Sequence, residues 1–327
     1  MNFQQLRSVR EAARRGYNLT EVAAALHTSQ PGVSRQIREL EEELGVELFQ
    51  RAGKRLTGMT PSGQQLLPVV ERLLREAENL RQSARDCASH DTGPLSLAAT
   101  HSQARYALPG AVKDFRHRYP KVTLSLHQGS PRQVAQMLID GEADIGIATE
   151  ALDQYPQLVT LPCYTWTHSV VVPPDHPLLD GEPLTLARLS KYPLITYDGG
   201  FTGRAHIDEA FAREGLQPSI VLSAMDADVI KTYVELGLGV GVVASIAFDP
   251  DRDRNLRAID AGHIFAVNMT RLAFRRGAFL RGYVYGFIET FAAPLTREVV
   301  EQAMLKARED EGRESGGVAG FPVADAV

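Results

Sequence analysis

Residues 29–44 carry the pattern that most limits how this chain can fold. Four apolar residues recur at helical spacing and fall on one narrow stripe, and they are Val33, Ile37, Leu40 and Leu44. A helix with such a stripe must pack against other helices. Ser29 can cap its amino end, and Pro31 is tolerated in its first turn because amides there have no helical partner. We therefore predict a short helix near residues 20–26, a turn at 27–29 and a packed third helix.

The opposite face of this third helix is polar and basic. It carries Gln30, Pro31, Ser34, Arg35 and Arg38. Arginine suits guanine or phosphate, glutamine suits adenine, and serine suits either. A hairpin-like stretch around Gly53 follows, with the basic residues Arg51, Lys54 and Arg55. We predict that residues 1–60 form a winged helix-turn-helix that binds DNA through these eight residues. The alternative is a small helical subdomain whose charged face is merely solvated.

Charge is distributed unevenly along the 327 residues, whose net charge is −5. Residues 1–63 hold nine basic and seven acidic side chains, so the rest of the chain is acidic. This asymmetry mildly supports a DNA-facing head. Glu41, Glu42 and Glu43 end the third helix, and we expect their repulsion from phosphates to leave only its first turns in the groove.

The chain has two cysteines, and their spacing is not that of a metal site, which is typical of a protein from a reducing cytosol. It shows neither a signal segment nor a long apolar run. We therefore predict a cytoplasmic protein with no membrane contact. No motif indicates a metal or a cofactor, so we expect neither.

Residues 61–90 read as one long helix that links two regions. Apolar residues alternate steps of four and three along it, at Leu66, Val70, Leu73, Ala77, Leu80, Ala84 and Cys87. Such a heptad seam favours pairing with a second copy of the chain over packing on its own domain. Paired DNA half-sites also demand a dimer. Pro68 lies inside this helix and predicts a kink near residues 64–68.

Residues 91–300 alternate strand-like and helix-like segments, which predicts an α/β domain with parallel pairing. Strands are predicted at 95–99, 122–128, 143–148, 169–172, 194–197, 220–223 and 240–244, and helices at 104–119, 131–139, 205–214 and 226–236. The last part, 301–327, is expected to hold the end of a helix and then, after about residue 308, a disordered Gly-rich tail.

Hydroxyl side chains gather where strands end and helices begin in this domain. Thr100, Ser102 and Gln103 follow one strand, Thr149 follows another, and Thr202 precedes a helix. Ligands of α/β domains bind at such points, and a helix amino end attracts an anion. Each residue alone could simply cap its own helix. The sequence spacing of these residues does not show whether they meet at one site.

Long segments of the chain resemble one known family. The runs "AAALHTSQPGVSRQIRELEEELGVELFQR", "LTGMTPSGQQLL", "THSQARYALPG", "GFTGR" and "DADVIKTYVELGLGVGVVAS" are similar to LysR-type transcriptional regulators, especially those of cysteine biosynthesis and sulfur assimilation. The resemblance extends to about residue 300. It implies an α+β, multi-domain protein: a winged helix-turn-helix, a linker helix, and a sensor like a periplasmic binding protein with a cleft between two α/β subdomains.

The resemblance also implies a ligand set and partners. The cleft would be lined by Thr100, Ser102, Gln103, Thr149 and Thr202, with Trp166 and the backbone around Ala227 nearby. Its effector would be N-acetylserine, formed from O-acetylserine, or a sulfate-like anion, with sulfide or thiosulfate opposing. The implied partners are promoter DNA, RNA polymerase and further copies of the chain, in a tetramer built as a dimer of dimers. Ser102 stands where the family pattern has threonine, and Pro68 is not part of that pattern.

Two other functional classes fit parts of the sequence less well. An enzyme could use Cys163 and His168 as nucleophile and base, but no third group is evident to orient them. The glycines 237, 239 and 241 resemble a dinucleotide loop, yet they follow a helix and precede a strand, which is the reverse of the required order. A solute-binding protein without gene control would explain the sensor but not the head.

Overall fold

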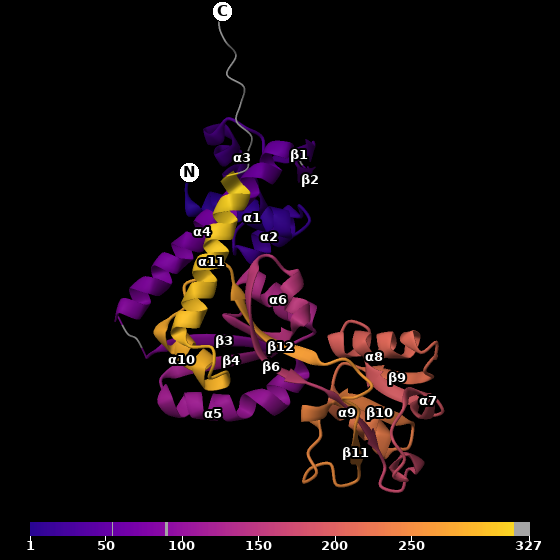
Figure 1. Ribbon diagram of the computed structural model, residues 1–327. Helices are drawn as coiled ribbons and strands as arrows, with labels where there is room; N and C mark the ends of the chain where they lie inside the picture. Colours follow the sequence, from indigo (N-terminus) through magenta and orange to yellow (C-terminus); the bar gives the residue numbers. More distant parts are fainter. Residues whose placement is uncertain (54, 89–90, 317–327) are drawn as a thin grey trace, which may run out of the picture. The chain divides into compact units, whose positions relative to one another are not determined.

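The computed structural model describes residues 1–53, 55–88 and 91–316, and the chain divides into two compact units, Met1–Ala88 and Ser89–Val327. The elements of the first unit are α1 (Phe3–Arg14), α2 (Leu19–Ala25), α3 (Gln30–Leu44), β1 (Phe49–Ala52), β2 (Arg55–Met59) and α4 (Pro61–Ala88) (Figure 1). Strands β1 and β2 pair antiparallel as a wing. The predicted winged helix-turn-helix followed by a long helix is therefore confirmed.

The head is held by the apolar stripe of α3. Val33, Ile37 and Leu40 are buried against α1 and α2, as the helical spacing predicts. Leu44 was expected on the same stripe, but it is 40% exposed. The reason is that the helix ends at this residue, because Gly45 follows with a left-handed φ of 69°. At the other end of α3, the Ser29 hydroxyl accepts the Gly32 amide at 3.3 Å, which confirms the predicted cap.

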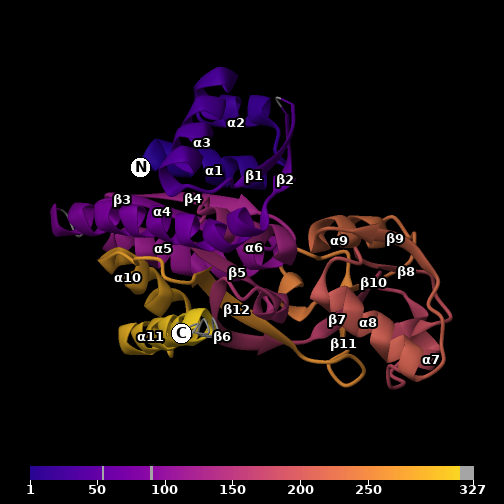
Figure 2. The same cartoon turned by 90° about the horizontal axis from the view of Figure 1, so that it is seen from above.

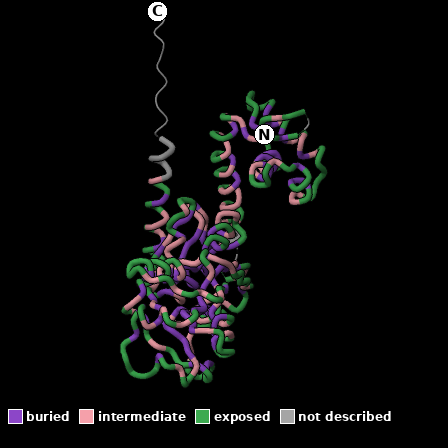
Figure 3. The backbone as a smooth tube through the Cα atoms, turned by 90° about the vertical axis from the view of Figure 1, so that its right-hand side faces the viewer, coloured by how far each residue is buried: buried purple, intermediate pink, exposed green. Residues whose placement is uncertain are grey.

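Some apolar residues of α4 are buried in the core of the head, and others are exposed to solvent. Val70 and Leu74 are buried in the core of the head, whereas Leu73 and Leu80 are 40% and 72% exposed. Figure 3 colours the backbone by burial and shows buried and exposed residues in turn along the chain. Val70 therefore does not belong to an open seam, since the head already covers it. The helix continues through Pro68, and the kink there stays a prediction. The Cys87 side chain lies outside the described residues.

The second unit contains two five-stranded sheets with helices on both faces. The first subdomain has the strand order β4-β3-β5-β12-β6, and the second has β11-β7-β10-β8-β9. The first subdomain contains β3 (Gly93–Ala99), the π-helical turn η1 (Gln103–Ala107), α5 (Leu108–Arg118), β4 (Val122–Gln128), α6 (Pro131–Asp140), β5 (Ile145–Thr149), η2 (Glu150–Gln154), β6 (Leu158–Trp166), β12 (Asn268–Arg275), α10 (Gly282–Phe291) and α11 (Arg297–Gly316). The second contains β7 (His168–Val172), η3 (Pro177–Leu179), α7 (Leu186–Leu189), β8 (Leu194–Tyr197), α8 (Thr202–Arg213), β9 (Ile220–Ala224), α9 (Ala227–Glu235), β10 (Val240–Ala244), η4 (Ser245–Ala247) and β11 (Arg257–Asp260).

The chain passes twice between these subdomains, after β6 and before β12. Parallel pairing, predicted from the alternation of strands and helices, holds for β3 with β4 and β5 and for β8 with β9 and β10. It is wrong for β7, which pairs antiparallel with β10 and β11. Strands β6, β11 and β12 were not predicted, and they also pair antiparallel. The reason is that the chain reaches β7 directly from β6 of the other sheet, and not through a helix from a strand of the same sheet, so the parallel crossover rule does not apply to it.

Alternating residues of each central strand face opposite helices. In the second subdomain Val170 and Val172 pack in the cluster with α8, whereas Val171 packs in the cluster with α9, on the other face of the sheet (Figure 2). Both faces are therefore covered, as a mainly parallel sheet requires.

Several segments begin or end at residues other than those expected, and three of these differences concern the pocket or the end of the chain. Helix α8 starts at Thr202, so this threonine lies in its first turn and not in a preceding loop. The helix predicted at 104–119 starts as the π-helical turn η1 and continues as α5. The disordered tail does not begin at about residue 308, because α11 continues to Gly316, and residues 317–327 lie outside the described part. None of the helices in the described part is long and apolar enough to cross a bilayer.

Candidate nucleic-acid interface and effector pocket

The outer face of α3 presents the predicted DNA-reading residues to solvent. Gln30, Pro31, Arg35 and Arg38 are exposed, and Ser34 is half-buried. Arg35 pairs with Glu39 one turn along the helix at 2.7 Å, while its side chain remains 81% exposed. Arg38 donates to the Ser34 hydroxyl at 3.1 Å. Such exposed contacts within a helix contribute little, so a phosphate or a base edge can replace them at small cost.

The wing is fixed to α3 by one buried carboxylate. Glu41 accepts the backbone amides of Leu48 and Phe49 at 2.9 and 3.1 Å, and Arg51 pairs with its other oxygen. Glu41 therefore does not face phosphates with Glu42 and Glu43, as the sequence suggested, because it is only 8% exposed inside the head. Arg51 is engaged in the same interaction. Among the other wing residues, Arg55 is exposed, and Lys54 lies outside the described residues.

Between the sensor's subdomains lies a pocket of about 410 Å³ that is open to solvent. Its lining residues come from the carboxyl ends of strands and the starts of helices. They are Thr100, His101, Ser102, Gln103, Thr149, Trp166, Tyr197, Phe201, Thr202, Gly203 and Met225. Six of the seven predicted ligand residues are thus brought together. Ala227, whose backbone was expected nearby, is not among them; its side chain is buried in the core under α9, and its part in the site stays a prediction.

The hydroxyls in the pocket come from three elements that are distant in sequence. Thr100 follows β3, Thr149 ends β5, and Thr202 begins α8. The Thr149 and Thr202 hydroxyl oxygens are 2.5 Å apart, and this hydrogen bond joins the two subdomains. Because the pocket wall includes Thr202 and Gly203, the amino end of α8 lies at the pocket, where free amides and the positive end of the helix dipole favour an anion. None of the lining residues is a lysine or an arginine.

Two further predicted residues have distinct surroundings. The Gln103 amide donates to the Thr270 hydroxyl at 3.1 Å and accepts from the Tyr164 hydroxyl, so its orientation is fixed by β12 and β6. The Trp166 indole N–H is buried and has no acceptor among the described residues. A buried donor of this kind gains from a ligand that carries an acceptor oxygen.

A buried histidine supports the floor of the pocket. His168 is fully buried beside the Trp166 ring, with the ring centroids 5.3 Å apart. Burial, and secondarily the nearby His206, lowers the pKa of His168 to about 4, so the ring is neutral at neutral pH. A Cβ on Gly203 would lie 3.0 Å from His168 Nε2 and 3.4 Å from the Trp166 ring. The glycine therefore allows the amino end of α8 to approach both rings closely.

The sequence did not single out five of the lining residues. Three of them are immediate neighbours of predicted residues, namely His101, Phe201 and Gly203. The other two lie at strand ends, since Tyr197 ends β8 and Met225 directly follows β9. The tendency of strand carboxyl ends to meet at one edge could have indicated the last two.

The features that suggested an enzyme have structural roles. Burial raises the pKa of the Cys163 thiol to about 11, which keeps it protonated and unreactive. Gly237 ends α9 with a φ of 78°, and a Cβ on Gly241 would lie 2.5 Å from Val171. The glycine run therefore provides a turn and close packing, not a phosphate-binding loop.

Together, the two units define a DNA-binding regulator with a ligand-binding sensor. The profile described as "Bacterial regulatory helix-turn-helix protein, lysR family" matches residues 3–64, and that of the "LysR substrate binding domain" matches residues 88–295. The chain belongs to the LysR family of transcriptional regulators, whose members bind promoter DNA and small-molecule effectors and form oligomers.

Individual relatives are regulators of the same type. The chain is 57% identical to the HTH-type transcriptional regulator SsuR of Burkholderia cenocepacia, over 94% of this chain and 100% of SsuR. It is also 57% identical to CysB of the same organism, over 93% of this chain and 97% of CysB. The solved cofactor-binding domain of the Cbl transcriptional regulator is 49% identical and has a TM-score of 0.64, covering 66% of this chain and 94% of that domain. The predicted resemblance to LysR-type regulators of the CysB type is thereby confirmed.

Proposed function

We propose that this regulator controls genes of cysteine biosynthesis and sulfur assimilation, and that its pocket binds a small anion of the sulfate or acetylserine type. The candidate effectors are N-acetylserine, O-acetylserine, sulfate and thiosulfate. One observation carries the choice of an anion: the hydroxyls of Thr100, Thr149 and Thr202 gather at the amino end of α8 without a lysine or arginine in the lining. Hydroxyls and free amides suit a small oxyanion. The similarity to CysB and Cbl supports the sulfur pathway.

On DNA, the first turns of α3 enter the major groove. Gln30, Ser34, Arg35 and Arg38 contact bases or phosphates, Pro31 lies against the backbone, and Arg55 of the wing contacts phosphate. Lys54 is proposed to act beside Arg55. Arg51 is assigned a different role, since its pairing with Glu41 positions the wing.

The chain acts as an oligomer in the cytoplasm. Leu73 and Leu80 on the exposed side of α4 pack against a second copy, and two such dimers form a tetramer. An effector that prefers one arrangement of the subdomains shifts the population of tetramer shapes, whereas one that binds both arrangements equally shifts nothing. The change in shape alters DNA bending and contact with RNA polymerase.

Footprinting tests this proposal directly. The full-length protein is added to promoters of sulfur-assimilation genes at roughly 0.1–0.2 M salt, with and without each of the four candidate effectors. We expect protection of paired half-sites and a change in its extent with acetylserine. Protection that does not differ between these promoters and unrelated DNA would contradict the regulatory targets.

A second candidate is a regulator of another small-anion or amino-acid pathway. It is favoured by Ser102, which keeps the hydroxyl but lacks the methyl group of the family's threonine and so leaves room for a different ligand. Calorimetry with the four candidates separates the two. Binding of none of them, with intact operator binding, would favour this second candidate.

A further inference from the structure

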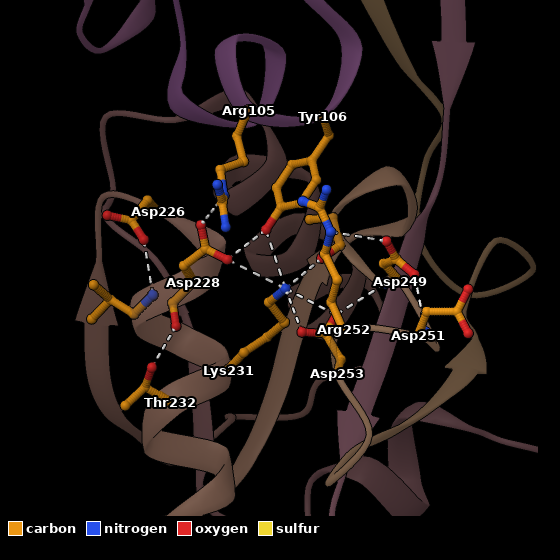
Figure 4. A network of polar contacts seen from close by, with 12 residues as sticks. Arg105, Tyr106, Asp226, Asp228, Lys231, Thr232, Asp249, Asp251, Arg252 and Asp253 are labelled. Carbon is orange, nitrogen blue, oxygen red and sulfur yellow. Dashed lines mark hydrogen bonds and ion pairs between the residues drawn. The ribbon is translucent and has the colours of Figure 1, made fainter. Parts of the chain in front are cut away.

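A polar network joins the two subdomains beside the pocket (Figure 4). Arg105 and Tyr106 belong to η1 of the first subdomain, and Asp228 lies in the first turn of α9 of the second. Arg105 Nε donates to Asp228 Oδ2 at 2.9 Å, and the Tyr106 hydroxyl donates to Asp228 Oδ1 at 2.7 Å. Both carboxylate oxygens of one subdomain are thus held by donors of the other. We call Arg105, Tyr106 and Asp228 the latch.

A buried ion pair fixes the latch from behind. Lys231 is only 6% exposed, and its Nζ donates to both oxygens of Asp253 at 2.9 Å and to the Tyr106 hydroxyl at 3.1 Å. The Tyr106 hydroxyl therefore accepts from an ammonium and donates to a carboxylate. Burial raises the pKa of Tyr106, so its hydroxyl keeps the proton it donates. Charge-assisted hydrogen bonds of this kind are stronger than neutral ones.

The latch is continuous with the pocket wall. His101, which lines the pocket between Thr100 and Ser102, has Nε2 3.6 Å from Asp228 Oδ2. Met225, another lining residue, directly precedes Asp226, which caps α9. A ligand that moves the wall at residue 101 therefore moves a neighbour of Asp228, and one that moves residue 225 acts on the cap of the helix that carries Asp228.

Other contacts between the subdomains are weaker in kind. On the side of α8, the neutral Thr149–Thr202 hydrogen bond is accompanied by His206 and Glu150 at 3.7 Å. The latch, in contrast, carries a guanidinium, a carboxylate and a buried ammonium. Among these described contacts between the subdomains, the charged groups therefore gather at η1 and α9, where Lys231 is the buried member.

We propose that the latch holds the cleft closed in the absence of effector and so sets how readily an effector enters and what affinity it has. The proposal deepens the function proposed above, since it takes the cleft as the effector site. Loosening the latch raises the population of open clefts, which exposes the pocket before any ligand arrives. Tyr106→Phe removes one hydroxyl and keeps the ring, and Asp228→Asn removes the charge that faces Arg105 and Lys231.

The single tryptophan of the chain reports on this opening, because Trp166 lines the pocket and is only 8% exposed. We expect the acrylamide quenching constant of its fluorescence, measured on the full-length protein without ligand, to rise about twofold in Tyr106→Phe and more in Asp228→Asn. Tyr192→Phe is the matched control, because this tyrosine packs on the ring of His176 within one subdomain and should leave quenching unchanged.

An unchanged quenching constant in Tyr106→Phe, with the fold intact by circular dichroism, would contradict the latch proposal. If Asp228→Asn does not fold, the result for Tyr106→Phe alone decides whether the proposal holds. The measurement needs no effector, so it fails independently of the proposed function. Raised quenching combined with no calorimetric binding of acetylserine, sulfate or thiosulfate would keep the latch and reject those effectors.

Discussion

On α3, the polar side chains that face solvent come from consecutive turns of a single helix, whereas the pocket hydroxyls come from three elements more than forty residues apart. Arg35 and Arg38 form hydrogen bonds with residues one turn away, Glu39 and Ser34. Thr149 and Thr202, in contrast, contact each other across two subdomains. A surface built by one helix survives changes in the rest of the fold, while a pocket built by several elements depends on every one of them.

The two regions also differ in what they bury. The head buries a carboxylate, Glu41, to fix its wing, and the pocket buries a neutral imidazole, His168, beneath its floor. The Glu41 carboxylate accepts from three donors, which stabilise its charge. Burial lowers the pKa of His168 and so keeps its ring neutral. Variants at these positions and on the two binding surfaces can therefore separate the head from the sensor.

The largest effect is expected for Glu41→Ala. Removing this carboxylate leaves the amides of Leu48 and Phe49 and the charge of Arg51 without their acceptor, which should destabilise the head by about 3–5 kcal/mol. Urea unfolding followed by circular dichroism should show an early transition that Trp166 fluorescence, which reports only the sensor, does not show. Glu42→Ala, at an exposed neighbour, is the control. A single shared transition in Glu41→Ala would mean that the head and the sensor do not unfold separately.

The next effect is a pH dependence confined to the sensor. Because the pKa of His168 is about 4 when folded and near 6.5 when unfolded, the unfolded state binds the extra proton between these values. The free energy of unfolding should therefore fall by up to about 3 kcal/mol as the pH drops from 6.5 to 4. His168→Phe should flatten this slope in Trp166-monitored unfolding, and His127→Gln, at an exposed position on β4, should not. An unchanged slope in His168→Phe would assign the dependence to other groups.

A smaller effect, restricted to DNA, is expected for Arg35→Ala. Losing a contact to a base edge or phosphate should weaken operator binding by about 2–3 kcal/mol. Effector affinity should stay the same, because α3 belongs to the other unit. Fluorescence anisotropy with operator DNA, and calorimetry with the effector, measure the two. Arg15→Ala breaks a comparable intrahelical pair, with Glu11 on α1, and serves as the control. Equal loss of both affinities would place the readout elsewhere.

The opposite pattern, a loss of effector affinity with operator affinity retained, is expected for a variant in the pocket. Thr202→Val keeps the shape of the side chain but removes the hydroxyl that faces Thr149, so effector affinity should fall by about 1–2 kcal/mol while operator affinity without effector is retained. Thr290→Val, which removes a hydroxyl bonded within α10, is the matched control. Calorimetry that finds unchanged affinity would remove Thr202 from the site.

The same contrast explains how far the sequence could predict this molecule. Helical spacing and caps were enough for the head, because Val33, Ile37 and Ser29 act through contacts within or next to one helix. Spacing could not show that Thr100, Thr149 and Thr202 converge, since that depends on how the chain crosses between two sheets. The resemblance to a known family supplied that step, and Met225, which it did not name, also lines the pocket. The role of Glu41 was misjudged because its buried donors come from residues 48, 49 and 51, beyond its own helix.

The smallest expected effect concerns residue 102, a serine where the resemblance implies a threonine. Ser102→Thr adds one methyl group to a half-buried lining residue, which can contribute at most about 1 kcal/mol of apolar contact with a ligand. If the pocket binds acetylserine, this methyl group should tighten the acetylated ligand by a few-fold and leave sulfate unchanged, because a bare oxyanion offers it no apolar surface. Competition calorimetry with the two ligands measures the ratio. A tightening of sulfate alone would instead mean that residue 102 acts through its hydroxyl, so that the choice between ligands depends on donors and not on apolar contact.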